Sequence, residues 1–330
     1  MTVKIFRFGE GLLGSVARAV EMQVLNFALL PVHALPLAAA LELGRATGRA
    51  AAVALPRYRR RAEEQLRAAF PAKSEAWAAR TAVACFEHFG QMAAEMLKAP
   101  RSAKSRGWSE IVKISGERPV LKAAREGKGL IFVSGHLGNW ELGAQWAGRN
   151  DLKLTSIAHR SRNARLHERM ERERQLRGHT TVAMNGAFRG LIRALRTGSI
   201  VALLTDRNPR DTGMLVPFFG RDILTVTTPA LLSCATGAPM VPFACLREGR
   251  AFRYTLYFDE PIRPDLAAPR DQEVARLTRE TTAALEKHIR KAPEQWQWMH
   301  RRWKITPGGR ERAGLAAAPA GLAERATSGR

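Results

Sequence analysis

A histidine and a glutamate five positions apart form the motif with the clearest chemical use in this sequence. His136 and Glu141 lie in the stretch GHLGNWE, directly after the apolar run LIFVS at 130–134. If His136 sits in a loop and Glu141 one turn into a following helix, the carboxylate can orient one ring nitrogen while the other takes a proton. Such a pair is a general base for a hydroxyl nucleophile. On spacing alone, the alternative that His136 is an ordinary loop histidine stays open.

Two further groups of charged residues follow. Asp206 and Arg207 come directly after the apolar run at 200–205, where an Asp-Arg-Asn-Pro turn is the competing interpretation. The segment 158–178 carries seven arginines and three glutamates. Its arginines are suited to gripping phosphate in bidentate fashion, but a solvated helix with ion pairs four residues apart explains the same pattern.

These groups need a scaffold, and the alternation of apolar runs with helical patterns predicts one. We expect strands at 111–114, 130–134, 154–158, 180–184, 200–205, 240–246 and 252–258, and helices at 61–70, 75–98, 141–146, 164–177, 187–196, 228–234 and 271–291. This order predicts an α/β fold with a central, mostly parallel sheet flanked by helices. Sites in such sheets form at the carboxyl ends of strands, where His136 and Asp206 both fall.

The N-terminal region predicts membrane association. Residues 24–43 are almost wholly apolar, close to the length of a bilayer span, and arginines follow them. By the positive-inside tendency, the remainder of the chain is expected on the cytoplasmic side. A buried, kinked soluble helix is the alternative. We therefore divide the chain into a membrane-associating segment (1–45), a catalytic domain (46–305) and a disordered tail (306–330).

Composition and charge narrow the class of protein. The 330 residues are 45% hydrophobic and 25% charged, which excludes a disordered, collagenous or polytopic chain. The three cysteines lie far apart, so neither a disulfide framework nor a structural zinc site is expected. The net charge of +23 indicates a polyanionic partner. A basic nucleic-acid-binding protein remains the rival class, although no nucleic-acid-binding motif is visible, and steep salt dependence of DNA binding would reveal it.

Five ordered blocks carry a family resemblance: HLGNWE, HRSRNARLHERMERERQLRG, LLTDRNP, VPFFGRDILTVTTPALLSCATGAPMVPF and PEQWQWMHRRWK. Over residues 25–304 the sequence resembles the bacterial lipid A late acyltransferases of the lauroyl/myristoyl type. The resemblance implies a glycerol-phosphate-acyltransferase-like fold with an N-terminal hydrophobic helix. It also implies transfer of a fatty acyl chain from acyl carrier protein, or from CoA, to a hydroxyl of a phosphorylated glycolipid. Neither a cofactor nor a metal is expected.

The same resemblance assigns residue roles. His136 matches the catalytic histidine and Glu141 its acidic partner. Arg174, Asp206, Arg207 and Arg160 are the expected substrate-binding residues. Arg160 stands in His-Arg-Ser, where the family usually has Tyr-Arg-Pro.

The sequence departs from the family pattern at two further places, of which only the second, the pair Asp206-Arg207, bears on the acceptor. Gln65 stands where the family usually has Asn, and the pair Asp206-Arg207 also resembles the related phosphatidylinositol mannoside acyltransferases. The expected location is the cytoplasmic face of the inner membrane, with anionic lipids and acyl carrier protein as partners and no nucleic acid. A catalytically inactive scaffold is the remaining alternative, and retention of both His136 and Glu141 argues against it.

Two aromatic groups have open roles. Phe218 and Phe219 are suited either to lining an acyl channel or to packing in the core. Trp296, Trp298 and Trp303 are suited either to a membrane interface or to packing at the edge of the sheet.

Overall fold

The computed structural model describes residues 35–98, 107–158, 172, 175, 179–183, 186–209 and 213–304. The helices in these ranges are α2 (Leu37–Ala54), α3 (Pro56–Ala69), α4 (Glu75–Lys98), α5 (Trp108–Ile111), α6 (Glu117–Arg125), α7 (Trp140–Arg149), α9 (Ala187–Arg196), α10 (Thr228–Thr236), α11 (Arg270–Lys291) and the short 3-10 helix η1 (Pro293–Gln295). The strands are β1 (Val112–Ser115), β2 (Leu130–Ser134), β3 (Leu154–Ala158), β4 (His179–Ala183), β5 (Ile200–Leu204), β6 (Met214–Phe218), β7 (Arg221–Thr225), β8 (Met240–Arg247) and β9 (Tyr254–Phe258).

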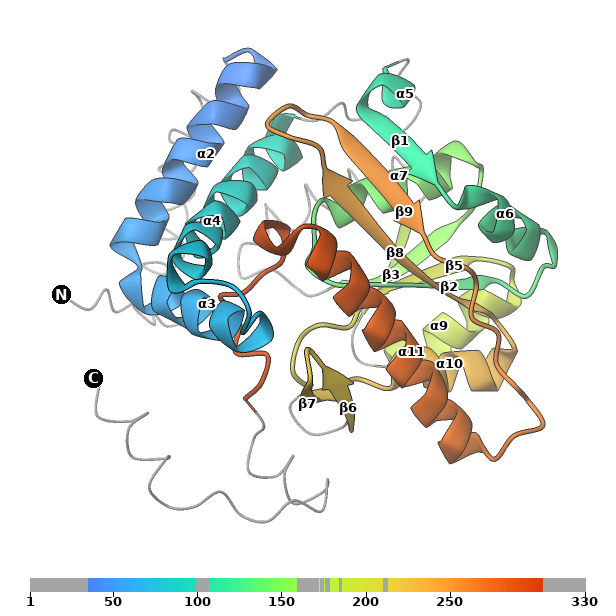
Figure 1. Ribbon diagram of the computed structural model, residues 1–330. Coiled ribbons are helices and arrows are strands. Elements are labelled where there is room, and N and C mark those ends of the chain that lie inside the picture. The colour runs from blue at the N-terminus through green and yellow to red at the C-terminus, as the bar shows by residue number, and fades with distance from the viewer. Residues whose placement is uncertain are drawn as a thin grey trace, which may run out of the picture.

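Seven strands form one mixed but mostly parallel sheet in the order β1-β9-β8-β2-β5-β3-β4 (Figure 1). The five strands from β8 to β4 run in the same direction, so their carboxyl ends meet at one edge. β9 pairs antiparallel with β8 and parallel with β1, which reverses the direction of the last two strands. The expected α/β fold with a mostly parallel sheet is therefore confirmed.

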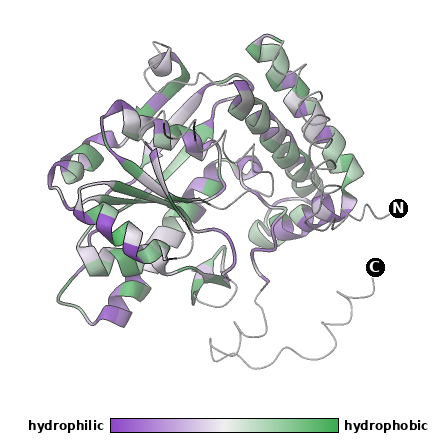
Figure 2. Cartoon of the chain, turned by 180° about the vertical axis from the view of Figure 1, so that it is seen from behind, coloured by the Kyte–Doolittle hydropathy of each residue, from purple (hydrophilic) through white to green (hydrophobic). Residues whose placement is uncertain are grey.

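Successive side chains of β2 are buried in two separate hydrophobic cores, one on each face of the sheet. Leu130 and Phe132 belong to a cluster with Trp146 of α7, whereas Ile131 and Val133 pack with residues of α9, α10 and α11. All five residues of β2 are buried, as the apolar run predicts for a central strand covered on both faces. Figure 2 shows hydrophobic residues along the central strands, whereas the surrounding helices carry both hydrophobic and hydrophilic residues.

The sequence did not reveal every element. All seven sheet strands match the expected apolar runs within about two residues at each end. β6 and β7, however, form a separate antiparallel hairpin that was not predicted. Its two-residue turn places Phe219 and Gly220 at φ 52° and 69°, a geometry in which a phenylalanine is rare.

The predicted N-terminal membrane segment falls largely outside the described residues. Its last part lies in α2, where Ala40 and Leu41 are buried in the core beside Ala94 of α4. Among the described helices none has both the length and the apolar character needed to cross a membrane. The expected disordered tail and most of the expected helix at 164–177 also lie outside the described residues.

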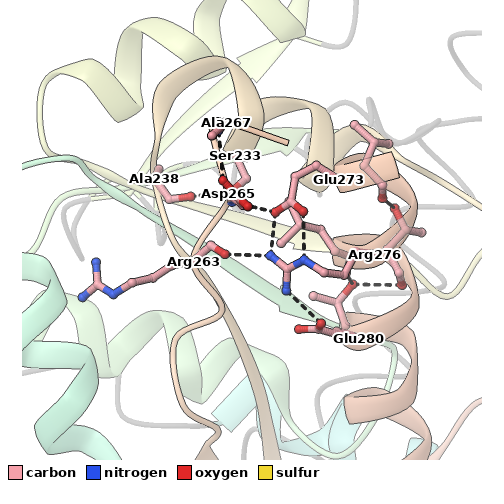
Figure 3. Close-up of polar contacts among 12 residues, drawn as sticks. Ser233, Ala238, Arg263, Asp265, Ala267, Glu273, Arg276 and Glu280 are labelled. Carbon is pink, nitrogen blue, oxygen red and sulfur yellow. Dashed lines mark hydrogen bonds and ion pairs between the residues drawn. The ribbon is translucent and has the colours of Figure 1, made fainter. Parts of the chain in front are cut away.

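A polar clamp fixes the start of α11 to the preceding loop (Figure 3). The buried Glu273 carboxylate accepts hydrogen bonds from the backbone N–H of Asp265 at 2.8 Å and from the guanidinium of Arg276. Arg276 also donates to the carbonyl of Arg263 at 2.8 Å. This clamp holds α11 across the sheet, which matters because Leu285, farther along α11, packs beside the loop that carries His136.

Candidate active site

The register of the sheet brings His136 and Asp206 together. Ser134, the last residue of β2, pairs with Leu204, the last residue of β5. His136 and Asp206 each lie two residues beyond that pair, at the carboxyl edge where parallel sheets form their sites. Two strands that are about seventy positions apart in the sequence thus deliver a histidine and a carboxylate to the same place.

Asp206 accepts three hydrogen bonds, two of them from His136. Its Oδ1 lies 2.7 Å from Nδ1 of His136, and its Oδ2 lies 2.7 Å from the backbone nitrogen of the same residue. The indole nitrogen of Trp296 donates to Oδ2 at 2.9 Å. Because an ionised carboxylate only accepts, Nδ1 of His136 carries a proton, and in the neutral form of the ring Nε2 is the nitrogen with the lone pair.

These contacts keep Asp206 charged although it is 5% exposed. Burial alone raises the pKa of a carboxyl group, but the hydrogen bonds and charge of His136, together with Trp296, lower the pKa of Asp206 to about 2. Gly135 makes this packing possible, since a Cβ there would lie 2.9 Å from Oδ2 of Asp206 and 3.0 Å from Leu285.

The loop after His136 is fastened on three sides. The backbone N–H groups of Gly138 and Asn139 donate to the carbonyls of Gln295 and Cys245 at 3.0 and 2.9 Å. Gly138 adopts φ 59°, and a side chain there would collide with the carbonyl of Cys245. Nε2 of His88 donates to the carbonyl of Gly138 at 3.4 Å, and burial lowers the pKa of that imidazole to about 3, so it stays neutral.

A buried ion pair underlies the same loop. The carboxylate of Glu95 is fully buried and lies 2.5 Å from the guanidinium of Arg247. It also accepts hydrogen bonds from Asn139 Nδ2 at 3.0 Å and from the Tyr254 hydroxyl at 2.5 Å. Burial raises the pKa of Glu95, while Arg247 and these donors oppose that shift. α4, β8 and β9 are thereby joined beneath the loop that carries His136.

The segment after η1 closes the site from the opposite side. Gln65 of α3 donates to the carbonyls of Trp298 and His300 and accepts from the backbone N–H of Arg302. The buried guanidinium of Arg302 donates to Asn208 Oδ1 at 2.8 Å and to the carbonyl of Leu224 at 2.7 Å. α3, the loop after β5 and the β6–β7 hairpin therefore all hold the segment that presents Trp296 to Asp206.

Comparison with known proteins identifies the family. The model of the family described as bacterial lipid A biosynthesis acyltransferase matches residues 16–305. The chain belongs to this family. The lipid A biosynthesis lauroyltransferase of Escherichia coli is 29% identical over 205 residues, covering 60% of this chain and 63% of that protein. The phosphatidylinositol mannoside acyltransferase of Mycobacterium tuberculosis is 27% identical over 185 residues, covering 55% and 56%. The chain thus matches little more than half the length of the latter.

Within this acyltransferase family member, the expected residues have different outcomes. His136 lies at the carboxyl edge of the sheet, as expected, and Glu141 lies in the first turn of α7. The carboxylate at Nδ1 of His136 is Asp206, for which a substrate-binding role was expected. The proposed pairing of His136 with Glu141 stays a prediction. Arg207 is exposed beside the site, and Arg160 and Arg174 lie outside the described residues.

The aromatic residues are core residues in the structure. Phe218 and Phe219 are 1% and 5% exposed, and Trp296 and Trp298 are 2% and 0% exposed. The rings contact one another, with Trp296 and Trp298 meeting edge to face at 4.6 Å between centroids. Packing, rather than a membrane interface, therefore explains these two tryptophans.

The arrangement supports proton transfer at a single imidazole. Among the described residues, no three His, Cys, Asp or Glu side chains converge in a way that could hold a metal ion. What does converge is a histidine with a protonated Nδ1, a buried carboxylate that fixes this tautomer, and a rigid loop. That set can remove a proton from a hydroxyl group at Nε2 and return it to a leaving group.

Proposed function

We propose that this protein transfers a fatty acyl chain from an acyl thioester to a hydroxyl group of a phosphorylated glycolipid, with His136 as the general base. The observation that supports it most directly is the 2.7 Å contact between Nδ1 of His136 and Asp206 in a chain of this family. In this proposal Asp206 is the positioning residue that selects the reactive tautomer. Glu141 remains a candidate second acid at the entrance to α7.

The chemistry balances without another reagent. Nε2 of His136 removes the proton of the acceptor hydroxyl as its oxygen attacks the thioester carbonyl carbon. The resulting tetrahedral intermediate collapses by breaking the carbon–sulfur bond, and the imidazolium returns its proton to the departing thiolate. Asp206 keeps its negative charge throughout and stabilises the imidazolium, because its pKa of about 2 keeps it ionised.

A lipid A precursor is our first choice of acceptor. The family description and the E. coli relatives, named as lipid A biosynthesis transferases, support this choice. The mycobacterial relatives, named as phosphatidylinositol mannoside acyltransferases, favour a second candidate acceptor. Lipid mass spectrometry of cells with and without the gene separates the two. A missing acyl chain on lipid A supports the first choice, and an unchanged lipid A pattern contradicts it.

We further propose that the enzyme works at the cytoplasmic face of the inner membrane and takes its acyl chain from acyl carrier protein. Apolar side chains are exposed where α2 meets α3, among them Val53, Leu55 and Tyr58. Four arginines lie in the same stretch, at positions 57, 59, 60 and 61. Basic residues near an anionic leaflet contribute about 1 kcal/mol each to binding. The net charge of +23 also suits an acidic carrier protein.

Replacement of His136 by alanine tests the function directly. A general base contributes about 10²- to 10⁴-fold to rate, so we expect the folded variant to lose activity by that factor. The variant His288→Gln is the matched control, because His288 pairs instead with Asp259 at 2.9 Å. Acyl transfer by His136→Ala within a few-fold of the wild-type rate would overturn the proposal.

A further inference from the structure

Two guanidinium groups and a second imidazole, from three separate parts of the chain, gather near His136. The ring of His300 lies 6.5 Å from that of His136, measured between centroids. Arg207, one residue after Asp206, is exposed at the same edge of the sheet. Arg61 of α3 donates to the carbonyl of Met299, the residue before His300, at 3.0 Å. The folding of the chain therefore concentrates positive charge where substrate must approach.

Asp206, the carboxylate paired with His136, is already engaged. Oδ1 of Asp206 accepts a hydrogen bond from His136, Oδ2 accepts from His136 and Trp296, and the side chain is buried. Burial lowers the pKa of Arg61, as do the charges of Arg301 and Arg57, while Tyr58 and Glu64 oppose that shift. A concentration of cations at a catalytic edge is suited to a ligand that supplies negative charge.

We propose that Arg61, Arg207 and His300 form a phosphate-binding site beside His136 that holds a phosphate group of a substrate. The proposal rests on the proposed function, because that reaction places a phosphorylated molecule at this edge. Phosphate fits the set because two guanidinium groups supply several hydrogen-bond donors, and protonated imidazole adds another. The phosphate belongs either to the headgroup of the acceptor or to the pantetheine arm of the acyl donor.

The electrostatics of His300 provide a readout that does not depend on catalysis. Partial burial lowers the pKa of His300, as do electrostatic interactions with Arg207, His136 and Arg61, while Asp206 opposes them. A phosphate dianion seated among these groups offsets their repulsion and favours the imidazolium. Phosphate binding must therefore raise the pKa of His300.

The first experiment measures that shift in the full-length protein in detergent. NMR titration of histidine ring protons, with His300 assigned from a His300→Gln variant, is run with and without inorganic phosphate at constant ionic strength. We expect phosphate to raise the apparent pKa of His300 in the wild type and in Arg196→Gln, a control on α9. We expect little shift in an Arg61→Gln/Arg207→Gln variant. An unchanged pKa in wild type, or an equal shift in the double variant, overturns the proposal.

The second experiment separates the two sources of phosphate. Loss of one charge-assisted hydrogen bond weakens binding by about tenfold or more, so Arg207→Gln is expected to raise one KM by that factor. A raised KM for acceptor alone assigns the phosphate to the glycolipid, and a raised KM for donor alone assigns it to the acyl carrier. Unchanged KM values for both overturn the proposal. If phosphate raises the pKa of His300 but the protein has no acyl transfer activity, the phosphate-binding site is supported and the proposed function is rejected.

Discussion

Replacement of Asp206 by asparagine is the sharpest test of the His136 geometry, because it alters the charge and one acceptor without changing the shape. Three donors converge on the carboxylate: the backbone N–H and Nδ1–H of His136, and the indole N–H of Trp296. Two of them share Oδ2. An asparagine oxygen in that position keeps both bonds, and its NH₂ group then faces Nδ1 of His136. The ring must change tautomer to accept from it, which protonates Nε2 and removes the base.

The magnitude follows from that change of tautomer and from the pKa. The comparable change in a serine-protease triad lowers kcat by about 10⁴-fold, so we expect a loss of about 10³- to 10⁴-fold here. The folded-state pKa of Asp206, about 2, lies below the ordinary 3.8 and corresponds to about 2 kcal/mol of stability. That contribution is complete above about pH 4 and is lost as the pH falls through the folded-state pKa. The difference in free energy of unfolding between wild type and Asp206→Asn should therefore become smaller at acid pH.

Three measurements check this reasoning. Acyl transfer is followed by mass spectrometry of the lipid product, stability by urea unfolding at several pH values, and the tautomer by ¹⁵N shifts of the His136 ring. Asp259→Asn is the matched control, because it alters another Asp–His pair at 2.9 Å and should retain the acyl transfer rate. A folded Asp206→Asn protein with activity within fivefold of wild type, or with Nδ1 still protonated, refutes the assignment.

Two further variants test the loop that carries His136. Gly138→Ala forces a side chain into the carbonyl of Cys245 at φ 59°, so we expect a loss of several kcal/mol in urea unfolding; near-wild-type stability would contradict the close approach. Glu95→Gln leaves the buried charge of Arg247 without its partner and should cost about 3–5 kcal/mol. The control is Glu248→Gln, which removes an exposed ion pair with Lys113 and should lower the free energy of unfolding by about 1 kcal/mol or less. Equal losses of stability in the two variants would refute the argument that the Glu95–Arg247 pair is buried.

The sheet and the position of His136 followed from local patterns. The run LIFVS is buried on both faces and almost wholly apolar, which is the composition that central parallel strands require. The glycines around His136 then marked the loop at the carboxyl end of the strand. Both features depend only on neighbouring residues, and such patterns are visible in a single sequence.

The partner of His136 depended on register instead. The sequence placed both His136 and Asp206 directly after apolar strands, which was the available signal, but adjacency of β2 and β5 is a long-range property. From the sequence we expect His136 to pair with Glu141, the nearer carboxylate along the chain, and that pairing stays a prediction. Glu95 and Arg247 were missed for a similar reason, because a glutamate in a helix ordinarily indicates a solvated face. Only the packing of α4 against β8 and β9 shows that it is buried.

The origin of Trp296 and His300 in residues 293–304 has a consequence for biosynthesis. These residues leave the ribosome after all the described strands and the helices α2 to α11. Domains generally begin to fold during synthesis. A nascent chain can thus form β2, β5 and the loop with His136 before Trp296 can cap Asp206. The order of translation delays completion of the reactive centre until the scaffold is present, so partly synthesised chains lack the finished site.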